Sequence, residues 1–372
     1  MMTNNYAMLE IHAGKVVKIL SHRSGFTEVL LDIDHIVKKA VNYDHITGKV
    51  SEGDWLILNT TAASLSLGTG GYHFVMANYT NKRLSLSPGG HGMKIRYTPS
   101  QVKISYAEEE LGHERHVFSK PLNLSGKLIC FGELHSMIPP LCAYFHYYYK
   151  KYIRKKVKIG YIMTDHAALP LAFSKNVANL KKQNLLDSVI TTGNAFGGDL
   201  ECVNIYTALQ AAAIVKKCDI IIVSMGPGIT GTGTRYGFSG LELGFYLDLA
   251  YRHGGQICFI PRISFAETRF RHYGISHHSI TLLKDIIQSP LCIALPNISM
   301  QKVKLLYKQL RINNLFSKHR ICIKDGSEIR DAMRYYGISV TSMNRGIAED
   351  PAFFYSIGAS ARKALSVFCP LH

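Results

Sequence analysis

Short runs of apolar residues alternate with longer segments of helical pattern between residues 127 and 261, and this alternation constrains the fold most. The apolar runs cover residues 127–132, 157–164, 188–192, 219–225 and 256–261. The helical stretches between them include residues 139–155, 201–217 and 241–253. Parallel strands need a helix-length crossover, which is almost always right-handed. We therefore expect a doubly wound, Rossmann-like α/β domain with a mostly parallel sheet and helices on both faces.

The same pattern continues more weakly after Arg271. Further strands are predicted at residues 291–296, 320–324 and 339–343. Asp350 and Pro351 then stand directly before a final segment of helical pattern. Asp is a favoured N-cap and Pro fits the first helical position, so we expect a helix that begins at Pro351 and is capped by Asp350.

In the first 120 residues, the spacing of apolar and turn residues differs from that in the rest of the chain. Runs rich in β-branched or aromatic residues, separated by turn residues, occur at residues 15–20, 27–33, 37–43, 55–59, 74–79 and 93–97. Many short strands with frequent turns favour a small all-β barrel. Residues 106–124 are polar and are interpreted as a linker. Since 372 residues suffice for two domains, we assign residues 1–120 to the barrel and residues 121–372 to the α/β domain.

Cysteine usage and hydropathy exclude several classes of protein. None of the eight cysteines has the C-x-x-C spacing of a zinc ribbon or a dithiol redox site, and several lie in strand-like apolar runs. Reduced, buried thiols are typical of the cytosol. The N-terminus lacks the pattern of a secretory signal, and no apolar run approaches the roughly 20 residues that span a bilayer. We expect a soluble, cytoplasmic protein without a membrane partner.

The chain is strongly basic. It holds 43 Lys and Arg residues against 26 Asp and Glu residues, which gives a formal net charge of +17. Such a balance suggests an anionic partner. Most lysines, however, lie on predicted helix faces and in the final third, whereas the segments after the predicted strands carry selected arginines instead. The position of these arginines therefore says more about function than the total charge does.

Polar residues follow each of the five predicted strands. In open α/β sheets, ligands bind beyond the carboxyl ends of the strands, where the loops meet. Carboxylate and imidazole groups suited to acid–base chemistry follow the first two strands. The candidate catalytic residues are Glu133, His135, Asp165 and His166.

Candidate ligand-binding residues come from the later strand ends. After the third strand they are Gly193, Asn194, Gly197, Gly198 and Asp199. After the fourth they are Gly226, Gly228, Thr230, Gly231, Thr232, Gly233, Thr234, Arg235 and Ser239. After the fifth and after the late strand they are Arg262, Glu267, Arg269 and Arg345. Backbone N–H groups, hydroxyls and guanidinium groups of this kind bind anions.

The loop after the fourth strand contains a literal G-x-G-x-x-G at Gly226, Gly228 and Gly231. It does not open a first βαβ unit, and no acidic residue ends the following strand, so a dinucleotide fingerprint is not supported. It also lacks the Lys-Ser or Lys-Thr ending of a Walker A loop. Ser239 and Glu242 have capping-box spacing, which predicts a helix start at Ser239. An anion-binding loop and a structural Ω-loop both remain open.

The sequence also contains candidate nucleophiles and candidate metal ligands. Asp199 is a plausible N-cap for residues 201–217, which would put Cys202 in a first turn that favours a thiolate; a packed thiol is the alternative. Ser136 and Ser239 lie outside any G-x-S-x-G motif, so capping explains them. His272, His277 and His278 with Glu267 could supply metal ligands, but their spacing matches no metal motif. We therefore assign no metal, and the cofactor stays unknown.

Several segments together resemble one family over nearly the whole chain. They are ELHS at 133–136, GNAFGGD at 193–199, MGPGITGTGT at 225–234, GFSG at 237–240, MNRG at 343–346 and EDP at 349–351. These segments are similar to those of the bacterial family catalogued as domain of unknown function 3866. That resemblance supports the fold and the location of the site and implies no activity.

Two functions from different classes follow. The first is a binder or enzyme that takes a small anionic ligand at the strand ends, for which a phosphate-bearing molecule is one option. The second is a nucleic-acid-associated or regulatory protein that uses the barrel and the basic surface; residues 147–158 mix aromatic and basic side chains. A solvated helix face explains that segment better. We also expect a homo-oligomer.

Overall fold

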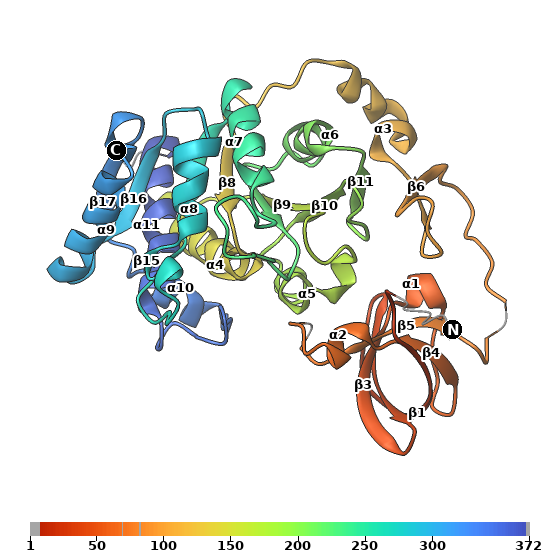
Figure 1. Ribbon diagram of the computed structural model, residues 1–372. Coiled ribbons are helices and arrows are strands. Elements are labelled where there is room, and N and C mark those ends of the chain that lie inside the picture. Colours follow the sequence, from red (N-terminus) through yellow and green to blue (C-terminus); the bar gives the residue numbers. More distant parts are fainter. Residues whose placement is uncertain (1–7, 69, 82, 370–372) are drawn as a thin grey trace, which may run out of the picture. The chain divides into compact units, whose positions relative to one another are not determined.

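The structure is a computed structural model that describes residues 8–68, 70–81 and 83–369. Its contacts divide the chain into two compact units, Met1–Lys103 and Ile104–His372 (Figure 1). The first unit is a small β structure and the second is an α/β structure.

The first unit contains the closed barrel that the sequence predicts. Its strands are β1 (Ile11–Arg23), β2 (Phe26–Ile33), β3 (Ile36–Asn42), β4 (Trp55–Asn59) and β5 (His73–Asn78), in the order β1-β2-β3-β5-β4. Strands β3 and β5 pair in parallel, whereas β1 with β2, β1 with β4, β2 with β3 and β4 with β5 pair antiparallel. The short helices α1 (Asp44–Thr47) and α2 (Thr61–Ser64) lie in its connections. Val29, Leu31, Leu56 and Leu58 fill the core.

The strand predicted at residues 93–97 is wrong. Only Gly92–Lys94 (β6) is extended, and it pairs with β7 (Val102–Ile104) in a separate two-stranded sheet. Ile95 and Tyr97 have φ values of 53° and 63°, in the left-handed region, which is incompatible with a continuing strand.

Residues 104–124 are packed rather than extended as a free linker. They contain α3 (Ala107–Glu110) and a 3₁₀ segment at Gly112–Ser119. Ala107, Leu122 and Leu124 belong to a core cluster of the second unit. Burial of these apolar side chains ties the segment to the α/β structure, so the contacts divide the chain near residue 104, whereas the sequence suggested residue 120.

The second unit is built on a six-stranded, wholly parallel sheet, which confirms the doubly wound α/β prediction. Its strands are β8 (Leu128–Gly132), β9 (Ile159–Thr164), β10 (Ser188–Thr192), β11 (Leu200–Cys202), β12 (Ile220–Met225) and β13 (Gln256–Ile260). Their order is β11-β10-β9-β12-β8-β13. Strands β8, β9, β10 and β12 are buried along their whole length, as expected for a sheet that is covered on both faces.

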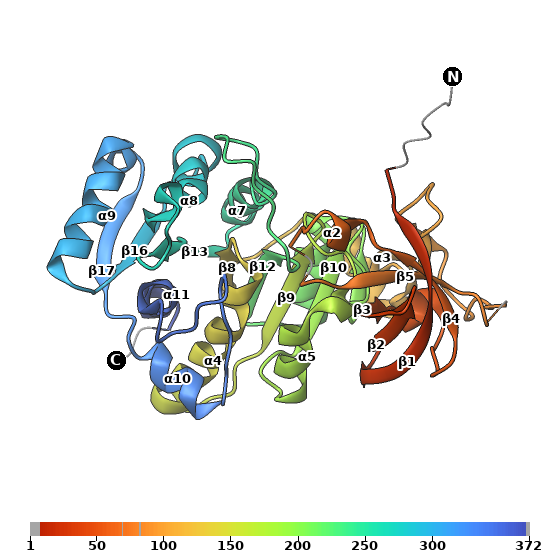
Figure 2. The same ribbon diagram turned by 60° about the horizontal axis from the view of Figure 1, so that its bottom comes forward.

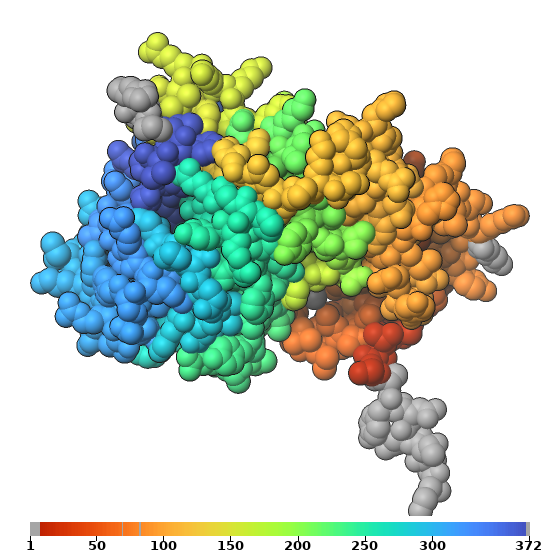
Figure 3. All heavy atoms as spheres, turned by 90° about the horizontal axis from the view of Figure 1, so that it is seen from above, coloured from red at the N-terminus to blue at the C-terminus, as the bar shows by residue number. Residues whose placement is uncertain are grey.

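Helices cover the sheet in two layers (Figure 2). One layer holds α4 (Ile138–Tyr148), α5 (Lys175–Lys182), α10 (Ile329–Tyr335) and α11 (Pro351–Phe368). The other holds α6 (Ile205–Gln210), α7 (Glu242–Arg252), α8 (His277–Thr281) and α9 (Met300–Ile312). A parallel pair, β16 (Cys292–Pro296) and β17 (Arg320–Lys324), lies next to β13, and β14 (Ile263–Ser264) pairs with β15 (Gly274–Ile275). The segments from α7 to α9 form a continuous surface (Figure 3).

The segment after β10 departs from the predicted helix at 201–217. Residues Leu200–Cys202 form the edge strand β11, parallel to β10, and Tyr106 bridges to Glu201. The helix begins at Ile205, because Asn204 provides a complete capping box with Thr207. Asp199 is therefore not a cap, and Cys202 is buried in a strand rather than placed in a first turn.

Three other local predictions are corrected or refined. Helix α7 begins at Glu242 without a side-chain cap, since the Ser239 hydroxyl accepts a hydrogen bond from the Thr230 N–H instead. Residues 339–343 form no strand, because Met343 has a φ of 49° and the chain turns there. Helix α11 begins at Pro351 as predicted, but the Asp350 carboxylate accepts a hydrogen bond from Ser264 (2.6 Å) rather than from the helix.

The remaining sequence expectations concern thiols and membrane segments. None of the eight cysteines forms a disulfide, and five of them are buried. Among the described residues, every helix is too short or too polar to cross a membrane.

Candidate functional site

The carboxyl ends of the central strands bring the site together. Register pairs Met225 of β12 with Thr164 of β9, and Val223 with Phe131 of β8, so Glu133 and Thr164 end at the same level on either side of β12. The chain leaves β8 and β9 toward α4 and α5 but leaves β12 toward α7, on the opposite face. Neighbouring strands whose connections run to opposite faces of the sheet define a topological switch point. Open α/β sheets bind their ligands at such points.

The first group of polar residues is the His166 cluster, formed by Asp165, His166 and Glu242. The Nδ1 atom of His166 lies 3.3 Å from Asp165 Oδ1 and 3.3 Å from Glu242 Oε1. Burial of the Glu242 side chain, with a smaller contribution from the Asp165 charge, raises the pKa of Glu242 to about 7. The His166 side chain is partly exposed, so the cluster is open to solvent on this side.

Asp165 also holds the loop that follows β10. Its Oδ2 atom accepts a hydrogen bond from the Asn194 N–H at 2.9 Å. Gly193 has a φ of 64°, and a Cβ atom there would overlap the Asp165 carboxylate. Gly193 and Asn194, both predicted to bind ligand, therefore position Asp165 through the backbone.

His135 lies on the other face of the sheet edge. Its Nε2 atom is 2.6 Å from the Ser174 hydroxyl, and its Nδ1 atom is 3.2 Å from Tyr161 OH and 3.3 Å from the Met225 carbonyl. Burial lowers the pKa of His135 to about 4, so the ring is neutral at pH 7. Both ring nitrogens of His135 lie within hydrogen-bonding distance of groups inside the fold. The surroundings of this candidate catalytic residue are therefore those of a buried structural histidine.

The second group is the arginine cluster, in which Glu267 meets Arg262, Arg269 and Arg345. Arg269 donates to Glu267 through Nε (3.0 Å) and Nη2 (2.8 Å), and Arg345 donates through Nη2 (3.2 Å). The Nη2 atom of Arg262 lies 3.6 Å from the same carboxylate. These contacts, above all those with Arg269, hold the pKa of Glu267 far below its usual range.

The arginine cluster carries excess positive charge. Arg345 Nε also lies 3.9 Å from Asp350 Oδ2, so three guanidinium groups share two carboxylates. Arg262 is buried, whereas the side chains of Arg345 and Arg269 are 24% and 45% exposed. Arg262, Glu267, Arg269 and Arg345 are all candidate ligand-binding residues from the sequence, and in the structure the three arginines lie around the Glu267 carboxylate.

The third group is the histidine cluster, formed by His272, His277, His278 and Glu133. One ring nitrogen of each histidine lies within 4.8 Å of those of the other two. Glu133 is fully buried; it accepts a hydrogen bond from Ser279, and its Oε2 atom lies 3.9 Å from His278 Nδ1. Burial raises the pKa of Glu133 to about 7, against the opposing effects of Ser279 and Arg262.

The histidine rings are neutral at pH 7. Burial is the main cause that lowers the pKa values of His272 and His278 to about 3; Arg262 and Arg269 come next for His272, and His277 and His272 come next for His278. The pKa of His277 is lowered as well, by burial first and then by Arg271 and Arg262.

The glycine-rich loop at residues 226–240 folds back on itself. The N–H of Thr232 donates to the Gly237 carbonyl (2.8 Å), and the N–H of Ser239 donates to the Thr230 carbonyl (2.9 Å). The Phe238 ring stacks on His278, with centroids 4.0 Å apart. The loop is thus a small hairpin that covers the histidine cluster.

Other predicted ligand-binding residues have internal partners. Arg235 forms two 2.7 Å hydrogen bonds with Asp285. The N–H groups of Gly197 and Gly198 donate to Glu201 Oε1 at 2.6 and 3.2 Å. The N–H of Val189 donates to Asp199 Oδ2 at 2.8 Å, and Lys181 forms an ion pair with the same carboxylate. These residues stabilise loops and the β10–β11 connection.

Sequence reasoning missed Glu242 and Ser279. It treated Glu242 as part of a capping box and rejected it as the acidic residue of a dinucleotide fingerprint, and Ser279 carried no motif. The adjacent residues Ser276, His277 and His278 were the available signal for the histidine cluster.

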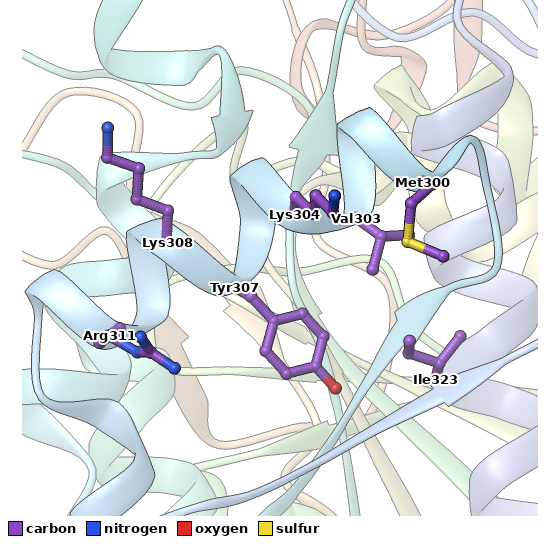
Figure 4. Close-up of a pocket in the computed structure, with 7 residues that line it drawn as sticks. All are labelled: Met300, Val303, Lys304, Tyr307, Lys308, Arg311 and Ile323. Atoms are coloured by element: carbon purple, nitrogen blue, oxygen red, sulfur yellow. The ribbon is translucent and has the colours of Figure 1, made fainter.

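A shallow, open pocket of about 440 Å³ lies elsewhere, between α9 and β17 (Figure 4). Its lining is Met300, Val303, Lys304, Tyr307, Lys308, Arg311 and Ile323. It is basic and partly apolar.

Comparison with known proteins gives one match. The family model described as "Protein of unknown function (DUF3866)" matches residues 39–361. No curated protein and no solved structure matches the chain significantly.

Proposed function

The chain belongs to the DUF3866 family of proteins of unknown function, and we propose that it binds a small anionic molecule at the carboxyl edge of its parallel sheet. The arginine cluster carries this proposal. Arg262 is buried beside Glu267, and Arg269 and Arg345 extend from the same carboxylate toward solvent. Three guanidinium groups that meet at one carboxylate retain donors and charge for a second anion.

The chemistry of arginine selects the ligand class. A guanidinium is always charged, and its planar donors match the oxygens of a phosphate or a carboxylate. Arg269 and Arg345 keep one or more N–H groups beyond those that Glu267 accepts, because each guanidinium has five. A phosphate-bearing molecule therefore fits better than a neutral one.

The His166 cluster extends the proposed site. Three strand spacings separate the ends of β9 and β13, which corresponds to about 15 Å along the same edge. A ligand longer than inorganic phosphate could reach from the arginine cluster to Glu242, whose pKa of about 7 suits proton transfer. This supports an enzyme that acts on the bound anion.

Thermal-shift measurements with inorganic phosphate, pyrophosphate and nucleotides, at constant ionic strength, test the proposal. A ligand present at one hundred times its Kd stabilises the folded state by about 2.7 kcal/mol. Arg269→Gln should reduce the ligand-induced shift. Arg362→Gln is the matched control, because Arg362 is 44% exposed against 45% for Arg269 and pairs with Asp325. The proposal fails if no anion stabilises the protein, or if both variants respond as wild type.

Nucleic-acid binding remains the second candidate, and two of the basic residues that motivated it, Lys150 and Lys151, have partners within the fold. Lys151 pairs with Glu328 at 2.7 Å, and Lys150 lies 4.6 Å from the centroid of the Tyr335 ring. This candidate would be favoured if the protein retained RNA or DNA in a salt-dependent manner and bound no small anion.

A further inference from the structure

We propose that His272, His277, His278 and Glu133 form a binding site for a divalent transition metal ion such as Zn²⁺. The sequence shows no metal-binding spacing here, because Glu133 stands after β8 and the histidines lie around β15 and the start of α8. The fold brings the carboxylate to the histidines. Imidazole and carboxylate are both established ligands of Zn²⁺.

The donor atoms are close enough for one ion. Each histidine offers one ring nitrogen within 4.8 Å of the others, and Glu133 Oε2 lies 3.9 Å from His278 Nδ1. In a tetrahedral site with bonds of 2.0–2.1 Å, neighbouring donors are about 3.3 Å apart. Small rotations of the histidine side chains would therefore bring the three imidazole nitrogens into coordination. Glu133 is the candidate for the fourth position, because its Oε2 atom lies beside His278 Nδ1.

Buried polar atoms that have no hydrogen-bond partner are an independent reason to place a metal ion here. Within the described part of the chain, Glu133 Oε2, His278 Nδ1 and His277 Nε2 are buried and have no hydrogen-bond partner. Leaving a buried polar atom unpaired costs about 1–3 kcal/mol, and native folds hold few such atoms. Three of them in one small group is explained at once by a shared cation.

The surrounding residues orient the ligands as in known metal sites. The Ser276 hydroxyl lies 2.8 Å from His272 Nδ1, which leaves Nε2 of that ring for the ion. Ser279 donates to Glu133 Oε1 and leaves Oε2. The stacked ring of Phe238 fixes the plane of His278. Hydrogen bonds of this kind to the second atom of each ligand are typical of metal sites.

Protonation and charge are compatible with metal binding. All three rings are neutral at pH 7, which is the form that binds a metal. The positive charge of Arg262 disfavours a cation nearby. Glu267 pairs with Arg262 and offsets this charge, and binding of the metal ion would keep Glu133 ionised. Glu267, which sequence reasoning grouped with these histidines, is instead committed to the arginine cluster.

The test uses the full chain, stripped with a chelator and titrated with Co²⁺ as a spectroscopic probe, followed by competition with Zn²⁺. We expect one Co²⁺ per chain, with the intense visible absorption of a four-coordinate site. Loss of an outer partner typically costs 10–100-fold in metal affinity, so loss of a ligand in His277→Gln or Glu133→Gln should weaken binding by about 100-fold or more. Circular dichroism checks that both variants fold.

His146→Gln is the matched control, since His146 is a partly buried histidine whose Nε2 atom lies 3.2 Å from the Leu185 carbonyl. It should bind Co²⁺ like wild type. The proposal is overturned if wild type binds neither Co²⁺ nor Zn²⁺, or if His277→Gln and Glu133→Gln both retain wild-type affinity. The readout is the metal itself, so the result does not depend on whether anions bind.

Discussion

Replacing Glu267 with Gln tests whether the arginine cluster is held together by one carboxylate. The amide keeps the shape of the side chain and removes its charge. Arg262, whose side chain is 4% exposed, then loses the carboxylate 3.6 Å away, while Arg269 at 45% exposure can turn to water. The cost should therefore arise mainly from the buried Arg262.

The expected loss follows from that burial. Removing one partner of a buried ion pair costs about 3–5 kcal/mol. Glu133, the first electrostatic partner of Arg262, can ionise in the variant and offset part of the loss. We expect a decrease of about 3 kcal/mol in the free energy of unfolding, against a typical total of roughly 5–15 kcal/mol.

Urea unfolding measures this loss. Trp55 is the only tryptophan, so its fluorescence reports on the barrel, whereas far-UV circular dichroism also follows the α/β unit. Asp331→Asn is the control: it breaks an ion pair with Arg334 whose side chains are 50% and 82% exposed, worth about 0–1 kcal/mol. A loss for Glu267→Gln no larger than that of the control would refute the reasoning.

The pH dependence gives a second readout of the same residue. The folded-state pKa of Glu267 lies below the unfolded value of 4.5, so its stabilisation is present above pH 4.5. That stabilisation disappears as the pH falls toward the folded pKa. The difference between wild type and Glu267→Gln should accordingly shrink in acid.

Two further predictions concern the His166 cluster. Gly193→Ala should lose at least about 2 kcal/mol of stability in urea unfolding, because a left-handed φ costs about 1–2 kcal/mol and the new Cβ would also overlap Asp165; Gly126→Ala, with a φ of 71° and open space, should lose less. The pKa of Glu242 rises from 4.5 to about 7 on folding, so wild type should lose about 2–3 kcal/mol relative to Glu242→Gln as the pH rises from 4.5 to 7. Parallel unfolding free energies for the two proteins across that range would contradict the assigned shift.

The sequence predicted the elements whose pattern is local. The apolar runs at β8, β9, β10, β12 and β13 are buried by helices on both faces, and periodicity reports such burial directly. Capping signals were less reliable where tertiary contacts compete. Glu201 accepts hydrogen bonds from Gly197 and Gly198, which draws residues 200–202 into a strand and leaves the cap to Asn204.

The site was predictable in location more than in detail. Strand ends identified Glu133, Asp165, Arg262 and Glu267 because topology brings such ends to one edge. The sequence did not predict the side-chain partners that come from distant elements. Asp285 neutralises Arg235 from 50 residues away, and the turn after β8 directs His135 to the opposite face, toward Ser174.

The edge strand β11 has a consequence for assembly. A sheet edge with unpaired backbone groups is a template on which another chain can add a strand, and short edge strands reduce this hazard. Strand β11 has only three residues, and Tyr106 bridges to Glu201 within it. Growth of the six-stranded sheet by strand addition is therefore disfavoured at this end, and the homo-oligomer proposed from the sequence would form through other surfaces.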